Sequence, residues 1–406
     1  MDNPFALPAA YREVQHQAWR FAQERLHPLL QRMDDEDWYP DHVMRELGQH
    51  GYLGITADPA YGGAGADLFT AGVICEAFGY WNLNVVAIWG PHENLCLNNI
   101  LRNGNEAQKA KYAPKMISGE WVGALGLTEP GAGSDALAGM RTTARREGDH
   151  YVLNGGKTFI SNGPVADVLL VYAKTSPERG AKGISAFIVE KGMPGFSVSQ
   201  KFRKMGWRGA PTGELFFEDC RVPLENLVGI EDAGVSVVMS GLDIERAFLA
   251  LGAIGECQRC LDLAVEYAAQ RKQFGQPIGS FQMVQAHLAQ MYTELEAARL
   301  LCYKAVWECN DLERGGGGRG EIHRLAAAAL LKAGEVNLMI VDRAVQIFGG
   351  SGFMWDTEVN RHYRNAKVTT IGGGTAEVRK LIIAQELLAS AGLSREQEER
   401  RHVAGR

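Results

Sequence analysis

The chain lacks the features that mark secreted and membrane-spanning proteins. Its seven cysteines are odd in number and scattered from Cys75 to Cys309, so they form no disulfide framework and suit a reducing compartment. No apolar run approaches the roughly 20 residues needed to cross a bilayer. The start Met1-Asp2-Asn3-Pro4 has neither the apolar stretch of a signal peptide nor an Arg-rich transit peptide. These absences predict a cytoplasmic protein.

An excess of positive charge and metal-ligand motifs are missing as well. A formal net charge of -6 disfavours a nucleic-acid or anionic-membrane surface. The ten histidines form no H-E-x-x-H or similar set, and the pair Cys257 and Cys260 has no second pair beside it, so we expect no metal site. What is present, 46% apolar and 22% charged residues in 406, is typical of a globular protein of two or three domains or one large composite fold.

Hydrophobic periodicity divides the chain into three parts. Helical spacing dominates from about residue 9 to 118, with expected helices over 11–33, 40–51 and 68–78. Short β-like runs follow at 151–153, 168–173, 184–189 and 214–217. Long helical segments return at about 235–270, 280–312, 321–348 and 358–391, with the Gly-rich stretch 314–320 as a linker. We predict a mainly α protein with a central β domain: an N-terminal helical domain (1–119), a middle β-barrel or sandwich domain (120–230) and a C-terminal four-helix bundle (231–406).

Two loop motifs carry the strongest functional signal. Residues 127–135 (LTEPGAGSD) and 157–163 (KTFISNG) build no core, yet they are crowded with backbone donors and hydroxyls. An ordinary turn is the simpler alternative for Gly131-Ala-Gly133. A nicotinamide-binding fingerprint is disfavoured, because Ala136 replaces its third glycine and Pro130 stands where a strand should enter the turn. Both loops are therefore candidates for holding another polar ligand.

These motifs resemble those of the acyl-CoA dehydrogenases. The first is similar to their TEPxAGSD signature and the second to their flavin-contacting K-x-[WF]-I-[ST]-N-G segment. The resemblance covers nearly the whole chain and includes 271–282 (RKQFGQPIGSFQ), 346–350 (QIFGG), 361–367 (RHYRNAK) and 374–377 (GTAE). Residues 94–98, 102–109 and 241–246 look most like the isovaleryl-type members. The family fold has the same order of helical, β and helical domains.

The resemblance also assigns the catalytic base. Dehydrogenation between Cα and Cβ of a thioester needs a base at Cα, a hydride acceptor and donors on the thioester oxygen. Most members carry the base as Glu in Tyr-Glu-Gly-Thr, but Gly373 stands at that place here, in Ile371-Gly-Gly-Gly-Thr375. Isovaleryl-type and long-chain members carry it at the position of Glu245. A solvated helix carboxylate, like its neighbours Asp243 and Glu256, is the alternative reading of Glu245.

Other roles follow from the resemblance by position. FAD is the implied cofactor, with its N5 as hydride acceptor, and the implied contacts are Leu125, Leu127, Thr128, Gly133, Ser134, Phe159, Ile160, Ser161, Arg271, Gln282, Gln346, Phe348, Gly349, Gly350, Thr375 and Glu377. The implied substrate contacts are Ser134, Ala87, Trp89, Asp243, Arg246, Leu249, Gly373 and Gly374, with the Gly373 N–H on the thioester oxygen. For Arg246 two roles stay open: a contact near the CoA moiety or a structural ion pair. The implied partners are an acyl-CoA substrate, electron-transferring flavoprotein and further copies of the chain in a homotetramer.

The expected reaction is dehydrogenation of a short or medium branched acyl-CoA to the 2-enoyl-CoA. Ala87 and Thr369 stand where isovaleryl-type members have a leucine and an aromatic residue, and smaller walls would admit a longer chain. A longer 3-methyl-branched substrate such as citronellyl-CoA is therefore an alternative. An oxidase or desaturase of a carrier-protein-bound acyl group and a non-catalytic flavoprotein are further alternatives.

Overall fold

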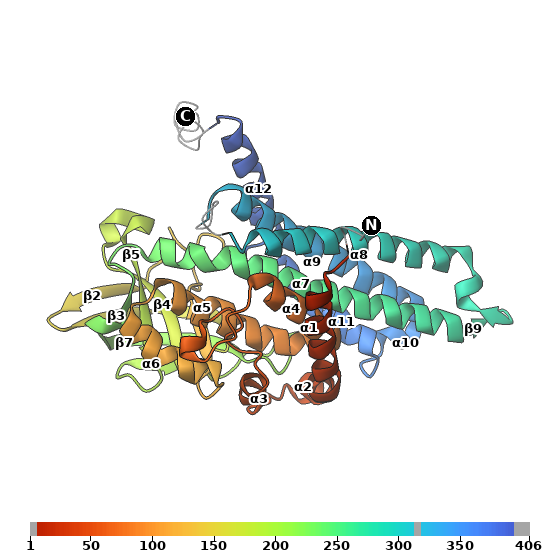
Figure 1. Ribbon diagram of the computed structural model, residues 1–406, viewed down its shortest axis with the longest axis horizontal. Helices are drawn as coiled ribbons and strands as arrows, with labels where there is room; N and C mark the ends of the chain where they lie inside the picture. Colours follow the sequence, from red (N-terminus) through yellow and green to blue (C-terminus); the bar gives the residue numbers. More distant parts are fainter. Residues whose placement is uncertain (1–5, 312–317, 394–406) are drawn as a thin grey trace.

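The computed structural model describes residues 6–311 and 318–393. A β domain lies at one end of the molecule, and long helices extend from it to a hairpin at the other end (Figure 1). The N-terminal helices lie against the middle of these long helices (Figure 1). This is the predicted order of helical, β and helical domains. Most of the Gly-rich linker expected at 314–320 lies outside the described residues.

The regular elements of the N-terminal domain are all helical, and two of them are π-helical. Its elements are α1 (Ala9–Phe21), η1 (Ala22–Leu26), α2 (His27–Glu36), α3 (Val43–Gln49), η2 (Pro59–Tyr61), α4 (Leu68–Gly90), η3 (Pro91–Leu97), α5 (Asn98–Asn103) and α6 (Glu106–Ile117). Helix α4 was expected to be amphipathic over 68–78, but it is buried on every side from Ala71 to Gly90. The stretch Leu68–Asn103 is long and apolar enough to pass a test for a membrane span, with 94% of its apolar window buried inside the structure. It is the core helix of this fold.

The middle domain is built on a single mixed sheet. Its strands are β1 (Gly123–Gly126), β2 (Thr143–Glu147), β3 (His150–Ser161), β4 (Val168–Lys174), β5 (Ile184–Glu190), β6 (Phe196–Val198), β7 (Thr212–Pro223) and β8 (Leu227–Val228), with short helices η4 (Pro177–Gly183) and η5 (Leu224–Asn226). The order is β6-β7-β3-β2-β4-β5-β8, and β1 pairs with β4. The apolar strands β4 and β5 are buried almost throughout. All four expected β runs lie within strands.

The C-terminal domain is a bundle of long helices. Its elements are α7 (Gly234–Gln270), β9 (Lys272–Gln273), β10 (Gln276–Pro277), η6 (Ile278–Ser280), α8 (Gln282–Glu308), α9 (Gly320–Phe348), α10 (Gly350–Phe353), α11 (Glu358–Ala366), η8 (Lys367–Thr370) and α12 (Ala376–Ser390). The single helix expected over 358–391 is broken at Gly373 and Gly374, whose φ values of +70° and +92° end a helix. All seven cysteines of the chain are buried and unpaired.

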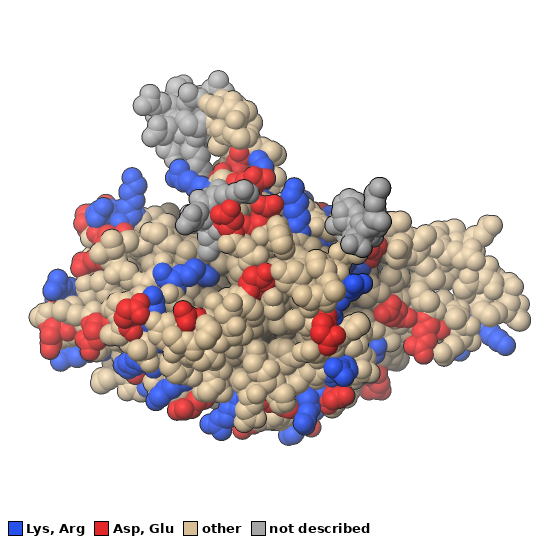
Figure 2. Space-filling model, viewed as in Figure 1, with Lys and Arg blue, Asp and Glu red and all other residues tan. Residues whose placement is uncertain are grey.

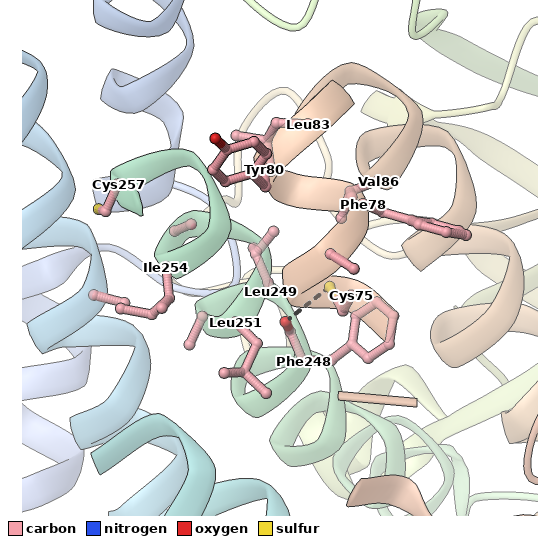
Figure 3. Packing of buried hydrophobic residues seen from close by; sticks show 14 of the residues in the cluster. Cys75, Phe78, Tyr80, Leu83, Val86, Phe248, Leu249, Leu251, Ile254 and Cys257 are labelled. Atoms are coloured by element: carbon pink, nitrogen blue, oxygen red, sulfur yellow. Dashed lines mark hydrogen bonds between the residues drawn. The ribbon is translucent and has the colours of Figure 1, made fainter. Parts of the chain in front are cut away.

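The core depends on a close crossing of α4 and α7 (Figure 3). A side chain at Gly79 would overlap the carbonyl oxygen of Gly252, and one at Gly255 would overlap the carbonyl oxygen of Glu76. Around these glycines the two helices interlock apolar side chains, and the Cys75 thiol donates to the carbonyl of Phe248 (3.3 Å). Only glycine permits this backbone approach, so the crossing fixes how the two helices lie.

Helix α4 bends at Asn82, which has non-helical φ and ψ of -159° and 83°. The Asn82 side chain stabilises the bend: its Nδ2 donates to Leu26 O (2.7 Å), and its Oδ1 accepts from Val85 N (3.2 Å) as a helix cap would. Beyond Gly90 the chain continues into the π-helical segment η3. Such segments are frequent at functional sites, because they turn side chains away from the ordinary helical positions.

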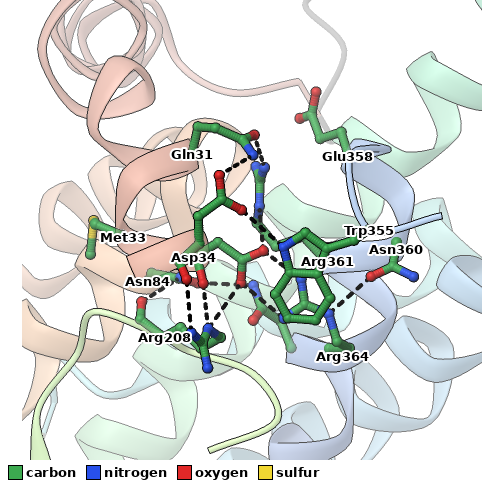
Figure 4. Close-up of polar contacts among 12 residues, drawn as sticks. Gln31, Met33, Asp34, Asn84, Arg208, Trp355, Glu358, Asn360, Arg361 and Arg364 are labelled. Carbon is green, nitrogen blue, oxygen red and sulfur yellow. Dashed lines mark hydrogen bonds and ion pairs between the residues drawn. The ribbon is translucent and has the colours of Figure 1, made fainter. Parts of the chain in front are cut away.

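A buried carboxylate joins all three domains. Asp34 on α2 is fully buried and receives Arg364 Nη1 on Oδ1 (2.9 Å), with Arg361 and Arg208 within 3.4 and 4.0 Å (Figure 4). Arg361 and Arg364 belong to α11 of the C-terminal domain, and Arg208 belongs to the middle domain. One side chain of the N-terminal domain therefore balances the charge of groups from the other two.

We expect Asp34→Asn to destabilise the fold strongly, because it leaves buried arginines without their carboxylate. Removing one partner of a buried ion pair costs about 3–5 kcal/mol. Asp35→Asn is the matched control, since Asp35 is exposed and its carboxylate accepts from Gln31 and Trp355; we expect less than about 1 kcal/mol there. Denaturant unfolding of both variants measures the difference, and equal effects would contradict this role of Asp34.

Candidate active site

Glu245 is buried at the middle of the molecule. It lies on α7 with 8% of its surface exposed, and its Oε2 accepts a hydrogen bond from Asn94 Nδ2 of η3 (3.1 Å). Burial raises the pKa of Glu245 to about 7, and the bond from Asn94 opposes that rise. It is therefore not a solvated helix carboxylate. A carboxyl group with this pKa can take up a proton near neutral pH.

Small and apolar residues surround this carboxylate. A β-carbon at Gly90 would lie 3.3 Å from Glu245 Oε1, so the absence of a side chain there leaves space beside that oxygen. Leu249 lies one turn after Glu245 on the same face of α7. Ala87 is buried one turn before Gly90 on α4. Trp89 is fully buried in the core, with its ring packed on Phe78 and Phe248.

Arg246 points away from the carboxylate of Glu245 and forms a separate polar cluster. Its Nη1 donates to Asp243 Oδ1 (3.0 Å) and its Nε to the carbonyl of Gly373 (2.9 Å). The His323 ring lies 2.7 Å from the same oxygen of Asp243. Of the two readings left open for Arg246, the structure therefore places it in an ion pair. Asp243, which the resemblance places near CoA, is 1% exposed and binds Arg246 and His323.

The turn at Gly373 presents a free backbone N–H. Two arginines bind the carbonyl oxygens of this turn: Arg379 donates to Gly372 O, and Arg246 donates to Gly373 O. The Gly372 carbonyl and the Gly373 N–H belong to one planar trans peptide and point in opposite directions. Arg379 thereby aims the Gly373 N–H away from itself, and within the described part of the chain no acceptor binds it. The turn thus offers a donor for a ligand oxygen.

The two sequence motifs are joined by a buried ion pair. Lys157 Nζ donates to Glu129 Oε1 (2.7 Å), and the same carboxylate accepts from the backbone N–H groups of Arg141 and Thr142. Burial alone would raise the pKa of Glu129, but Lys157 and these hydrogen bonds hold it below its usual range. A further bond joins Thr158 N to Thr128 O (2.8 Å). The loops therefore form one rigid unit.

This unit exposes groups suited to a flavin. The pairing of β3 with β7 shifts register between Lys157 and Ile160, and Phe159 in this bulge has φ of +58° and is 69% exposed. In the described residues the hydroxyls of Thr128, Ser134 and Ser161 make no hydrogen bond, and a side chain at Gly133 would meet nothing within 4 Å. An exposed aromatic face beside free donors fits a heteroaromatic ring system.

The remaining residues of this predicted set differ in exposure. Leu125 is half-buried, whereas Leu127 is buried at the edge of the core. Ile160 packs its side chain into the interior of the β domain, so only its backbone faces the bulge. Thr375 caps α12 by accepting from Val378 N (3.3 Å), and Glu377 lies exposed in the first turn of that helix.

A second predicted group lies at the far end of the bundle. Arg271, Gln282, Gln346, Gly349 and Gly350 are all exposed there. Tyr267 contacts both parts of this end of the bundle: its carbonyl accepts from Arg271 N (2.8 Å), and its ring stacks on Phe348, another predicted contact (4.1 Å between centroids). At 1.5 Å per helical residue, Arg271 is roughly 40 Å along α7 from Glu245. This group is therefore far from the buried carboxylate of Glu245.

Several residues of the site escaped the sequence reasoning. Asn94 lies in the stretch 94–98 noted for its resemblance, but its role was not predicted, and Arg379 and Gly90 lie in no noted motif; only their contacts with Glu245 and the glycine turn reveal these roles. Thr369, predicted at a pocket wall, is fully buried, and its carbonyl accepts from Arg379 (2.8 Å). Asn162 was inside a recognised motif, but its bonds from Nδ2 to Ile88 O and Gly123 O required the fold.

A fold of this order with a buried carboxylate, a free backbone donor and loops suited to a flavin defines a flavin-dependent oxidoreductase. Family models agree: the N-terminal, middle and C-terminal domains of acyl-CoA dehydrogenase match residues 8–120, 124–220 and 232–388. The chain belongs to the acyl-CoA dehydrogenase family, whose members are FAD-dependent oxidoreductases acting on CH–CH bonds.

Known relatives span different substrates. The mitochondrial isovaleryl-CoA dehydrogenase of Pongo abelii is 44% identical over 93% of this chain and 89% of its own. Butyryl-CoA dehydrogenase from Megasphaera elsdenii is 37% identical with a TM-score of 0.90, covering 96% of this chain and all of that one. A chain solved in work on the electron transferring flavoprotein of Acidaminococcus fermentans is 39% identical with a TM-score of 0.90, covering 95% and 100%. The FAD complex of PigA is 30% identical with a TM-score of 0.90, covering 95% and 99%.

We expect Lys157→Met to loosen the hold on FAD, because Glu129 then keeps a buried charge without its cation. Breaking such a pair costs about 3–5 kcal/mol, and the two loops should separate. The ratio of flavin to protein absorbance after gel filtration should fall well below that of the parent. Lys191→Met is the control, since Lys191 is 67% exposed beside Asp167. Full flavin retention by Lys157→Met would contradict the role of the pair.

Proposed function

We propose that this protein dehydrogenates a short or medium branched acyl-CoA between Cα and Cβ, with Glu245 as the base that takes the α-proton. The observation that carries the proposal is the buried carboxyl group of Glu245, whose pKa is raised to about 7, on the helix that also contacts the Gly373 turn through Arg246. At the alternative base position the chain has Gly373, which has no side chain. The resemblance to isovaleryl-type members points to the same assignment.

The residues divide the chemistry between them. Glu245 accepts the proton from Cα, and the Gly373 N–H donates to the thioester oxygen, which makes that proton more acidic. Bound FAD supplies the acceptor for the hydride from Cβ. Exclusion of water strengthens both interactions, because the site has a low dielectric constant. Electron-transferring flavoprotein is the proposed acceptor of the electrons.

The chain length of the substrate is a separate part of the proposal. Similarity to isovaleryl-CoA dehydrogenases favours a short branched acyl group, whereas a relative named for butyryl-CoA is close as well. Ala87 supports room for a longer chain, because it is a small residue one turn before Gly90, which lies beside the carboxylate of Glu245. A longer 3-methyl-branched acyl-CoA such as citronellyl-CoA is the alternative substrate.

A homotetramer belongs to the proposal, because Arg271 and the other predicted FAD contacts at the far end of the bundle are separated from Glu245 by roughly 40 Å along α7. A second copy could bring its distal group to the flavin loops of the first. The distal end is suited to such a contact: Phe274 in the hairpin is 92% exposed, and Met283 at the start of α8 is 73% exposed. Few charged side chains lie on this end in the face shown (Figure 2).

We expect Glu245→Gln to bind FAD and acyl-CoA but to reduce the flavin about 10² to 10⁴ times more slowly, the usual effect of losing general-base catalysis. Glutamine retains the shape and an acceptor for Asn94. Stopped-flow bleaching of the flavin by isovaleryl-CoA measures the rate. Glu266→Gln is the control, being exposed on the same helix; Asp243 is unsuitable because of its buried pair with Arg246. Bleaching by Glu245→Gln at the parent rate would exclude this base.

Relocating the base tests the same assignment. Glu245→Gly combined with Gly373→Glu should recover only part of the activity, because Gly373 has φ of +70° and a β-carbon there would lie 3.0 Å from Leu330 Cδ2.

We expect Ala87→Leu to reduce kcat/KM for a longer 3-methyl-branched acyl-CoA more than for isovaleryl-CoA. Each methylene that no longer fits is worth about 1–3 kcal/mol, or roughly 10- to 200-fold. Butyryl-, isovaleryl- and citronellyl-CoA form the panel for parent and variant. Equal losses of kcat/KM on all three substrates would show that Ala87 does not set chain length. In the same assays, rapid reoxidation of the reduced flavin by air would favour the oxidase alternative.

A further inference from the structure

A one-way chain of hydrogen bonds ends on Glu245. Thr56 Oγ1 donates to Asn98 Oδ1 (3.1 Å), Asn98 Nδ2 donates to Asn94 Oδ1 (3.4 Å), and Asn94 Nδ2 donates to Glu245 Oε2 (3.1 Å). Each amide accepts from the residue behind it and donates to the residue ahead. Such chains polarise their members, which strengthens the last bond.

The chain is held firmly at both ends. Asn94 lies in the middle of η3 and Asn98 begins α5, so the two side chains, four residues apart, meet on one face. The loop that carries Thr56 is tied to η3 by Glu93, which accepts from the backbone N–H groups of Gly54 (2.9 Å) and Ile55 (3.0 Å). Of the four residues in this chain of hydrogen bonds, Asn94, Asn98 and Glu245 are buried and Thr56 is half-buried.

We propose that Asn94 is the positioning residue of the catalytic base: it holds Oε2 of Glu245 and leaves Oε1 as the oxygen that takes the α-proton. The proposal rests on the base role of Glu245 given above. Asn94 Nδ2 is a donor without a free lone pair, so it can fix a carboxylate but cannot itself relay a proton. Oε1 instead faces Gly90, where the missing side chain leaves space.

The ionisable groups around Glu245 bind other partners, so none of them holds its carboxylate. Cys75 on α4 donates its thiol to Phe248 O, and burial raises its pKa well above the usual value. Glu93 binds Gly54 and Ile55, while Asp243, Arg246 and His323 bind one another. Among the described residues, Asn94 is the one side-chain donor to Glu245. Without it, burial alone would act on the carboxylate.

The test is the pH profile of flavin bleaching by isovaleryl-CoA in the FAD-loaded enzyme. Loss of a hydrogen bond to a buried charge is expected to raise the apparent pKa of the base by about one to two units in Asn94→Leu. The rate should then fall about 10- to 100-fold below that pKa and recover towards the parent rate at alkaline pH. An equal loss at every pH would indicate a structural role alone and would overturn the proposal.

Further variants keep the test decisive. Asn94→Ala is measured in the same way should the leucine variant fail to fold. Asn98→Leu keeps the Asn94 donor and should shift the profile less, and Thr56→Val, at the outer end, should shift it by less than about 0.3 unit. Glu245→Gln separates the two proposals. If this variant reduces the flavin at the parent rate, the base assignment fails. If it is inactive and the pH profile of Asn94→Leu is unshifted, only the role of Asn94 is removed.

Unfolding against pH gives a readout independent of turnover. Because folding raises the pKa of Glu245 from 4.5 to about 7, the native carboxyl holds its proton where the unfolded one has lost it. Stability therefore falls as pH rises through this window and levels off above it. In Asn94→Leu the fall should extend to higher pH, and adding Glu245→Gln should remove that extension. Glu93, with a pKa also raised to about 7, contributes the same background to every variant. An unmoved window would overturn the proposal.

Discussion

The crossing of α4 and α7 is the constraint on which the site depends. Gly79 and Gly255 allow the two backbones to touch, because a side chain at either position would overlap a backbone carbonyl oxygen of the other helix. Two turns before Gly252 on α7 lies Glu245, and the far half of α4 leads to Gly90 beside its carboxylate. The distance between the proposed base and Gly90 is therefore set by backbone contact, which is stiffer than a contact between flexible side chains.

The buried base destabilises the fold that holds it. A rise in the pKa of Glu245 from 4.5 to about 7 corresponds to roughly 3 kcal/mol above neutral pH. Asn94 reduces this penalty without neutralising the carboxylate, as an arginine or lysine in the same place would do. The cations nearby are engaged elsewhere, Arg246 by Asp243 and Gly373 and Arg379 by the glycine turn. Keeping cations away from Glu245 preserves its basicity near neutral pH.

The sequence predicted the order of the domains because hydrophobic periodicity differs clearly between helices and strands. It also identified the two loop motifs, whose glycines and hydroxyls have no role in a core. It did not predict the bend at Asn82 or the two π-helical segments, because these depend on contacts such as that of Asn82 with Leu26. Asn94 and Arg379 were missed for the same reason. An asparagine or arginine in a helical pattern gives no sign of which distant atom it will reach.

The shape of the turn at Gly373 and Gly374 accounts for the position of the proposed base on α7. Gly373 and Gly374 adopt φ values of +70° and +92°, which a side chain would strain. With its carbonyls bound by Arg379 and Arg246, the turn has its N–H left as its functional group. A carboxylate on Gly373 would press against Leu330 and would share the space that the N–H needs. With the proposed base on α7, the turn is free to hold the thioester oxygen in the proposed reaction. Arg246 joins the two elements through its bond to Gly373 O, so that proton removal and oxygen polarisation would act on one substrate.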